Sequence, residues 1–124
     1  MAIAAISEAE SIVMEVLWRN SPMATEDIVS ALSAQRWQAP TIKTLLSRLL
    51  SKRAIRAEKD GRRYLYSAVL QRDEWLSSES KGLLDRLFGG RVAPLVAHFS
   101  KQRKLSKKDI AELKRILTEL DDDR

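Results

Sequence analysis

The sequence predicts a mainly α-helical protein with one small β-hairpin, because three features of the chain agree. Apolar residues recur at helical spacing along most of its 124 residues. One strong hairpin signal, Asp60-Gly61, interrupts that pattern. Residues 36–66 carry nine Lys or Arg residues against two acids, a local net charge of +7 in a chain whose total is +5. Such a concentration of one sign focuses an electric field on a polyanionic partner.

Two helices are expected within the first 35 residues. Ser7 and Glu10 form a capping box, and apolar residues then recur at helical spacing up to Trp18. This first helix should end near the segment "RNSP". A second helix should start at Thr25, with acids in its first turn and an inward face of Ile28, Val29 and Leu32, and should fade near Gln35.

A third helix is expected to have two chemically different faces. It should begin at Pro40, after the connection 36–39, with Ala39 as a poor N-cap. Its inward face should hold Ile42, Leu45, Leu46, Leu49 and Leu50. The outward face contains no acid and consists of Thr41, Lys43, Thr44, Ser47, Arg48 and Ser51. Since a solvated face usually mixes both signs, this one is suited to phosphates and base edges, with an ordinary basic surface helix as the alternative.

The hairpin that follows should have a basic tip. A two-residue Asp60-Gly61 loop would place Lys59 opposite Arg62, Glu58 opposite Arg63, and Ala57 opposite Tyr64, continuing to Ile55 opposite Tyr66. In that register Ile55, Ala57, Tyr64 and Tyr66 share a face that packs on the helices, and Glu58 partly neutralises Arg63. The tip cations that should contact phosphates are Lys59, Arg62 and Arg63. Three helices followed by a basic hairpin are the order of a winged helix-turn-helix domain, here assigned to residues 1–70.

Residues 71–124 are expected to form a helical dimerisation region. Two apolar sets define it, Leu76, Leu83, Leu84, Leu87 and Phe88 in one helix and Ile110, Leu113, Ile116, Leu117 and Leu120 in the last. The first helix should stop at Gly89-Gly90, and Ser106 with Asp109 should cap the last. A segment of 54 residues seldom buries enough apolar surface alone, so we expect a homodimer, with burial inside one chain as the alternative.

Composition excludes several classes of function. The chain has no cysteine and one histidine, His98, so disulfides, thiolate metal sites and cysteine nucleophiles are absent, and we expect no metal, cofactor or enzymatic activity. Ser78 and Lys81 match an SxxK pattern, but its partner motifs are missing. The longest apolar runs are too short to cross a bilayer, and the N-terminus does not resemble a signal peptide, which predicts a cytoplasmic protein without membrane insertion.

Four segments, "ISEAESIVMEVLW", "TIKTLLSRLLSK", "GRRYLYS" and "LLDRLFGG", resemble in order and spacing the penicillinase repressor family, also called the BlaI/MecI/CopY family. The resemblance runs from about residue 5 to residue 120. It implies an N-terminal winged helix that binds double-stranded operator DNA and a C-terminal part that dimerises. It also implies relief of repression when a membrane-bound sensor metalloprotease leads to cleavage in the C-terminal part.

Two departures from the family pattern narrow what the resemblance implies. Copper-responsive relatives carry cysteine ligands near the C-terminus, and their absence here argues against copper sensing. In the β-lactam branch the cleaved bond is typically Asn-Phe, whereas the matching segment "VAHFSK" offers His98-Phe99 as the candidate cleavage site. The alternative is a family member whose inducer is unrelated to β-lactams.

The sequence therefore leads to a first hypothesis of a homodimeric transcriptional repressor that binds a palindromic operator. In it, Thr41, Lys43, Thr44, Ser47 and Arg48 enter the major groove while the hairpin tip holds the DNA backbone. The second hypothesis is a winged-helix protein-interaction module whose basic face meets an acidic protein. A third, a small hydrolase, has no supporting set of base, nucleophile or metal ligands.

Overall fold

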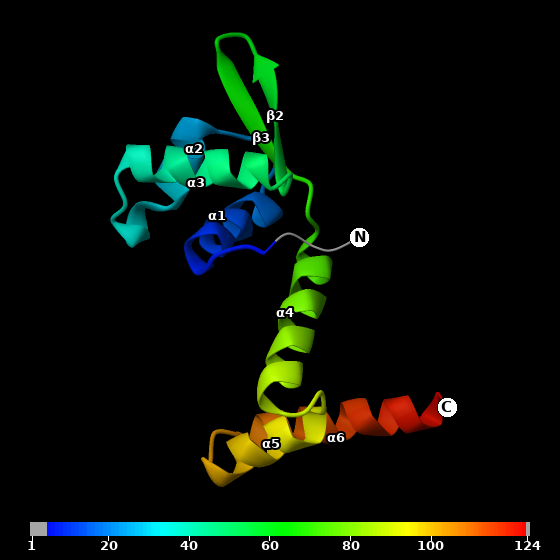
Figure 1. The fold of residues 1–124 in the computed structure, drawn as a ribbon. Coiled ribbons are helices and arrows are strands. Elements are labelled where there is room, and N and C mark those ends of the chain that lie inside the picture. The colour runs from blue at the N-terminus through cyan, green and yellow to red at the C-terminus, as the bar shows by residue number, and fades with distance from the viewer. Residues whose placement is uncertain (1–4, 124) are drawn as a thin grey trace. The chain divides into compact units, whose positions relative to one another are not determined.

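The computed structural model describes residues 5–123, so residues 1–4 and 124 of the predicted domain ranges lie outside it. The elements follow in the order α1 (Glu8–Arg19), β1 (Met23–Ala24), α2 (Thr25–Ala31), the short 3-10 helix η1 (Ser33–Gln35), α3 (Ala39–Ser51), β2 (Ile55–Asp60), β3 (Arg63–Ala68), α4 (Arg72–Leu87), α5 (Val92–Lys101) and α6 (Lys107–Asp122) (Figure 1). The expected mainly helical fold with a small hairpin is confirmed.

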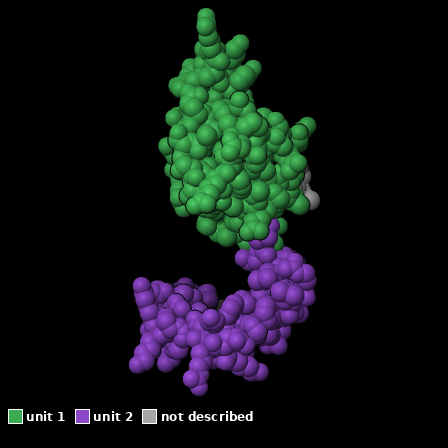
Figure 2. All heavy atoms as spheres, turned by 90° about the vertical axis from the view of Figure 1, so that its left-hand side faces the viewer, with its two compact units in different colours: residues 1–78 green, residues 79–124 purple. Residues whose placement is uncertain are grey.

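The chain forms two compact units, residues 1–78 and residues 79–124 (Figure 2). The division falls inside α4, whose first turns belong to the first unit. There the Trp18 indole N–H donates to the Leu70 carbonyl at 2.7 Å, and the Trp18 and Trp75 rings lie 5.3 Å apart. The Arg72 Nε donates to Glu15 at 3.0 Å. The functional boundary expected after residue 70 lies shortly before α4, which starts at Arg72, and stays a prediction.

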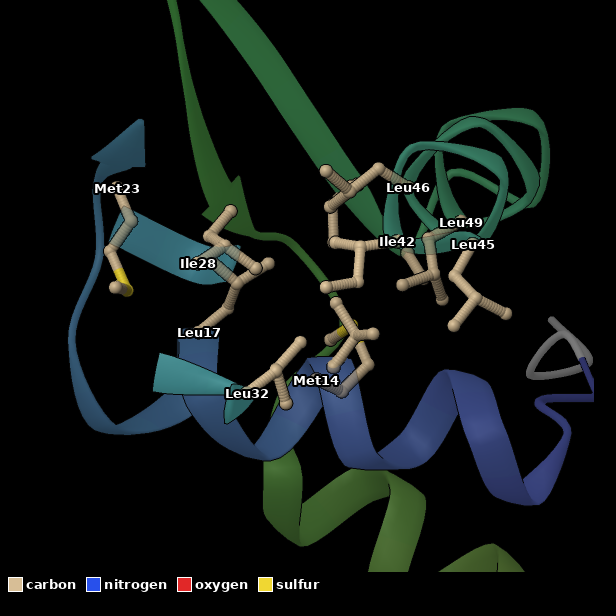
Figure 3. Packing of buried hydrophobic residues seen from close by; sticks show 12 residues of the cluster. Met14, Leu17, Met23, Ile28, Leu32, Ile42, Leu45, Leu46 and Leu49 are labelled. Carbon is tan, nitrogen blue, oxygen red and sulfur yellow. The ribbon is translucent and has the colours of Figure 1, made fainter. Parts of the chain in front are cut away.

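The hydrophobic core of the first unit lies between its three helices and the sheet. Figure 3 shows Ile42, Leu45, Leu46 and Leu49 of α3 directed toward Met14 of α1, with Leu17, Met23, Ile28 and Leu32 in the same cluster. Each of these side chains is at most 8 % exposed. The inward face predicted for the third helix is therefore the buried face, with Leu50 half-buried at its edge.

The helix boundaries differ from the expected ones at two places. The second helix, expected to fade near Gln35, ends at Ala31 and continues as η1. The third begins one residue earlier than expected, with Ala39 as its first residue and Gln38 as an N-cap whose side chain makes no capping bond. Pro40 is still within the first turn, where a missing N–H costs nothing because that donor has no helical acceptor.

The sheet has three antiparallel strands in the order β1-β3-β2. Strand β1 was not expected from the sequence, because two residues cannot display a period. Its Met23 lies opposite Tyr66 and its Ala24 opposite Leu65. This short pairing joins the start of α2 to the hairpin and so fixes the hairpin to the helical core.

The predicted register of the hairpin is wrong by two residues. Asp60 pairs with Arg63, so Lys59 lies opposite Tyr64 rather than Arg62, and Ala57 lies opposite Tyr66. The loop is Gly61-Arg62, in which only Gly61 has a positive φ, +64°. A glycine at the first central position suits a type II′ turn, which replaces the expected type I′ turn. Because a shift of two residues preserves the alternation of faces, Ile55, Ala57, Tyr64 and Tyr66 still share one face.

The second unit consists of the rest of α4 with α5 and α6. Helix α4 stops at Gly89 and Gly90, which both have positive φ, and the Ser106–Asp109 capping box of α6 is present as predicted. Between residues 79 and 123, no residue is fully buried. Large apolar side chains are instead exposed, namely Leu83, Leu87, Val92, Phe99, Ile110, Ile116, Leu117 and Leu120.

A buried ion pair links α1 to the end of α3. Glu10 is 1 % exposed, and its Oε1 accepts from the Ser7 N–H at 2.8 Å and from the Lys52 Nζ at 2.5 Å. Lys52 is the C-cap residue of α3. Burial alone would raise the pKa of Glu10, but the hydrogen bonds from Lys52 and Ser7 outweigh burial and hold its pKa below the ordinary glutamate value.

The ionised pair should stabilise the fold in a pH-dependent way. Since the folded pKa of Glu10 lies below the unfolded pKa, its contribution is present above about pH 4.3 and is lost as the pH falls through the folded pKa. Glu10→Gln should lower the free energy of unfolding by about 1–3 kcal/mol at pH 7. Urea denaturation at pH 7 and pH 3 measures this, and the difference from wild type should shrink at pH 3.

Glu8→Gln is the matched control, because Glu8 lies in the same turn, is exposed, and has no ion pair among the described residues. It should change stability by less than about 0.5 kcal/mol. Equal losses in the two variants, or a loss in Glu10→Gln that does not depend on pH, would contradict the role assigned to the pair.

Candidate nucleic-acid interface

The outward face of α3 presents donors and cations to solvent. Thr41, Lys43, Thr44, Ser47, Arg48 and Ser51 are all exposed, as the helical spacing predicts. The Thr44 hydroxyl donates its hydrogen to the Pro40 carbonyl at 3.0 Å. The Thr44 side chain therefore offers a ligand its methyl group and the acceptor lone pairs of its oxygen. The face thus combines two long cations with small side chains that allow close approach to a ligand.

The wing, the hairpin of β2 and β3, extends past the helices of the first unit (Figure 1). Lys59, Arg62 and Arg63 are exposed near its tip. Tyr64 was expected to pack on the helices but is 50 % exposed, because its part of the strand lies beyond the core; Tyr66 packs against the core as expected.

Arg63 differs from the other two tip cations because carboxylates of the same unit are near it. Its guanidinium lies 3.8 Å from Glu26 in the first turn of α2 and 3.5 Å from Asp60 across the loop. The expectation that Glu58 neutralises Arg63 is wrong: Glu58 lies 3.6 Å from Arg56 on its own strand, because the shifted register moves it away from Arg63. All these groups are largely exposed, so each pair is worth at most about 1 kcal/mol.

Most of the cations in residues 36–66 have no carboxylate of the chain beside them. Lys52, Arg56 and Arg63 form ion pairs. Within the described part of the chain, no carboxylate lies within 4.0 Å of the remaining six, which are Arg36, Lys43, Arg48, Arg53, Lys59 and Arg62. Their charge is therefore available to an external anion.

An open groove of about 510 Å³ lies between α2 and α3, lined by Thr25, Glu26, Val29, Ser30, Ala39 and Lys43. Among residues 5–123 there is no group of three or more His, Asp or Glu side chains that could hold a metal ion. In the same range, none of the helices has both the length and the apolar character that crossing a membrane requires.

Arg36 and Arg53 were not assigned a role from the sequence. They lie just before and just after α3, and both are exposed. Only the concentration of charge between residues 36 and 66 could have drawn attention to them, because their distinctive feature, the backbone conformation, has no signal in the sequence.

Comparisons with known proteins give one consistent result. The model of the family described as penicillinase repressor matches residues 6–119. The chain is 34% identical to the penicillinase repressor of Bacillus licheniformis, over 92% of this chain and 90% of that protein. It is 31% identical to the methicillin resistance regulatory protein MecI of Mammaliicoccus sciuri, over 90% and 92% of the two chains.

A similar solved structure is the monomeric form of Bacillus licheniformis BlaI in complex with the blaP half-operator. The TM-score is 0.52 at 35% identity, covering 59% of this chain and 90% of that one. The likeness in structure therefore concerns the winged-helix part.

The pair between Arg63 and Glu26 should compete with a bound phosphate. Glu26→Gln should therefore tighten binding to duplex DNA by about twofold to fivefold, because it frees one cation without altering the fold. Fluorescence anisotropy with a labelled duplex at 0.1 M salt measures the effect.

Asp27→Asn is the matched control. It removes the same charge from the same turn of α2, but Asp27 has no ion pair among the described residues. Equal tightening in both variants would show a general effect of net charge and would reject the competition at Arg63.

Proposed function

The chain belongs to the penicillinase repressor family, and we propose from this premise that it is a homodimeric transcriptional repressor that binds a palindromic operator in double-stranded DNA. The family is one of repressors rather than enzymes. A relative that is 35% identical over the winged-helix part has been solved with its half-operator, which supports the same partner for this chain. The observation that carries the proposal is the acid-free, exposed outer face of α3.

In this proposal α3 is the recognition helix, and its residues differ in what they read. Arg48 and Lys43 are long enough to donate to guanine O6 and N7 in the major groove. Thr41 and Ser47 donate to phosphates or base edges, and the methyl group of Thr44 suits a thymine methyl. The buried face of the helix supports the proposal, because it leaves the helix only one orientation on the unit.

The wing holds the adjoining DNA backbone. Lys59 and Arg62 are exposed, have no carboxylate within 4.0 Å among the described residues, and suit direct phosphate contact. When DNA binds, the Arg63 guanidinium leaves the carboxylates of Glu26 and Asp60 and contacts a phosphate instead. Each phosphate neutralised contributes about −0.9 to the slope of log affinity against log salt.

The second unit supplies the dimer contact. The proposed dimerisation residues along and just after α4 are Leu76, which precedes the second unit, and Leu83, Leu84, Leu87 and Phe88; those of α6 are Ile110, Leu113, Ile116, Leu117 and Leu120. In α6, positions 110, 113, 117 and 120 have the alternating three- and four-residue spacing of a helix-pairing seam. Leu117 is 59 % exposed and Leu120 is 46 % exposed. These exposures support a partner chain, because covering large apolar side chains would remove their surface from water and lower the free energy. A two-fold dimer presents two recognition helices about 34 Å apart, one turn of DNA.

Repression is relieved by cleavage between His98 and Phe99, through a pathway started by a membrane-bound sensor metalloprotease. Both residues are exposed in the last turn of the ten-residue helix α5, which supports access after local unfolding. Cleavage there would separate α6 from the DNA-binding unit. The dimer would then lose the effective-concentration gain that links its two half-sites.

Base-reading and phosphate-binding residues should respond differently to mutation. Arg48→Ala should weaken binding to the preferred duplex by about 1–3 kcal/mol and relax the preference at one base pair. Arg62→Ala should weaken all duplexes alike and reduce the salt slope by about 0.9 per protomer. A duplex selected by the wild-type protein from a random library serves as the probe in gel-shift titrations. Unchanged binding in both variants would reject the assignment of α3 and the wing.

The apolar stripe of α6, formed by positions 110, 113, 116, 117 and 120, should hold the dimer together. Leu117→Glu should place a charge in the seam and convert the dimer to a monomer at micromolar concentration, with loss of tight operator binding. Sedimentation velocity measures the mass. Val69→Glu is the control, since Val69 is 47 % exposed in the first unit and lies outside the stripe. A dimer that persists in Leu117→Glu would contradict the proposed contact.

A further inference from the structure

Three of the helical segments end on an arginine with a left-handed backbone. Arg36 follows η1 with φ +58°, Arg53 follows α3 with φ +61°, and Arg103 follows α5 with φ +55°. These are the non-glycine residues with positive φ in the described part of the chain. Helix α4, in contrast, stops at two glycines with positive φ. The chain thus uses glycine at one helix end and arginine at three.

The ends of α3 and α5 have the same hydrogen-bond geometry. After α3, the Arg53 N–H donates to the Leu50 carbonyl and the Ala54 N–H donates to the Leu49 carbonyl, both at 3.0 Å. After α5, the Arg103 N–H donates to Ser100 at 3.1 Å and the Lys104 N–H to Phe99 at 3.0 Å. Both are Schellman motifs, whose left-handed position strongly favours glycine because a Cβ crowds the backbone there.

Among the described residues, no ion pair offsets this strain at Arg36 or Arg53. Both side chains are exposed, and no carboxylate lies within 4.0 Å of either among residues 5–123. Neither guanidinium therefore adds an ion pair to the stability of the first unit within the described part of the chain. Strained backbone positions of this kind concentrate where a ligand is bound.

The position of these two residues indicates the ligand. Arg36 lies three residues before the first residue of α3 and Arg53 two residues after its last, so they bracket a helix of 13 residues. Such a helix is roughly 20 Å long, while the major groove is about 12 Å wide. Cations at the two ends of a helix in the groove are therefore near the two phosphate chains that border it.

We propose that Arg36 and Arg53, the flanking arginines, are phosphate-binding residues that clamp α3 across the major groove. The proposal rests on the proposed function, because it requires α3 to be the recognition helix. Arginine suits the task because its planar guanidinium binds a phosphate with two parallel hydrogen bonds. The free-energy cost of the strained backbone is then offset by phosphate contacts in the complex with DNA, and not by contacts in the free protein.

The test is to replace each arginine by glycine in the full-length protein. Arg53→Gly removes the Cβ and the charge together, so it relieves strain while removing the proposed contact. The melting temperature should stay the same or rise by a few degrees, since the greater freedom of glycine in the unfolded chain offsets part of the gain. Affinity for the duplex selected by the wild-type protein should fall about fivefold to tenfold per contact at 0.1 M salt, and the salt slope should decrease by about 0.9 per protomer. Arg36→Gly should behave alike.

Two further variants separate the clamp from other effects. Arg53→Lys keeps the cation and should keep most of the salt slope. Arg103→Gly changes the same residue in the same motif, but in the second unit, so it should give the same thermal response without a change in affinity or slope. Sedimentation velocity on each variant checks that the oligomeric state is that of wild type.

The outcomes distinguish this inference from the proposed function. If wild type binds the duplex with a steep salt dependence and Arg53→Gly leaves both affinity and slope unchanged, the clamp is wrong and the repressor assignment stands. A fall in both melting temperature and affinity would assign Arg53 a structural role and would also overturn the clamp. If wild type selects no duplex at all, the proposed function fails first.

Discussion

The packing of α3 on α1 is the contact on which the interface depends, because it fixes the rotation of the recognition helix about its own axis. Ile42, Leu46 and Leu49 are each at most 2 % exposed, so the helix has one stable orientation. A rotation by a single residue, 100°, would bury a cation or expose a leucine. The side chains that meet a ligand are therefore selected by the hydrophobic effect acting on the opposite face. Folding and binding use different faces of one helix.

Ion pairs within the first unit then determine which cations remain available. Glu10 retains Lys52 at the end of α3, where the positive charge also suits the helix dipole. Glu26 and Asp60 lie near Arg63 on the wing. The remaining cations of residues 36–66 repel one another in the free protein, and a phosphate backbone relieves that repulsion. Positive charge thus contributes to association with DNA and little to stability.

Much of the fold could be predicted from the sequence, because helical periodicity and capping residues are local signals. The phase of α3, the two capping boxes and the glycine stop of α4 follow from them. The hairpin register could not be predicted, since the Asp60-Gly61 pair fits either a loop of Asp60-Gly61 or a loop of Gly61-Arg62. These two loops give pairings of β2 with β3 that differ by two residues, and which pairing forms depends on strand β1 and on the turn. The exposure of Tyr64 depends on how far the hairpin extends past the helices. The left-handed conformation of Arg53 has no local signal at all, because glycine is the residue expected there.

The central claim is that the outer face of α3 and the tip of the wing face DNA together. An NMR titration of the ¹⁵N-labelled full-length protein with a selected duplex tests it most directly, by observing backbone and arginine side-chain signals at each position. The account predicts that shifts concentrate in residues 41–51 and 59–64, on the side of the first unit away from α1. Shifts concentrated on α1, with the signals of α3 and the wing unmoved, would contradict it.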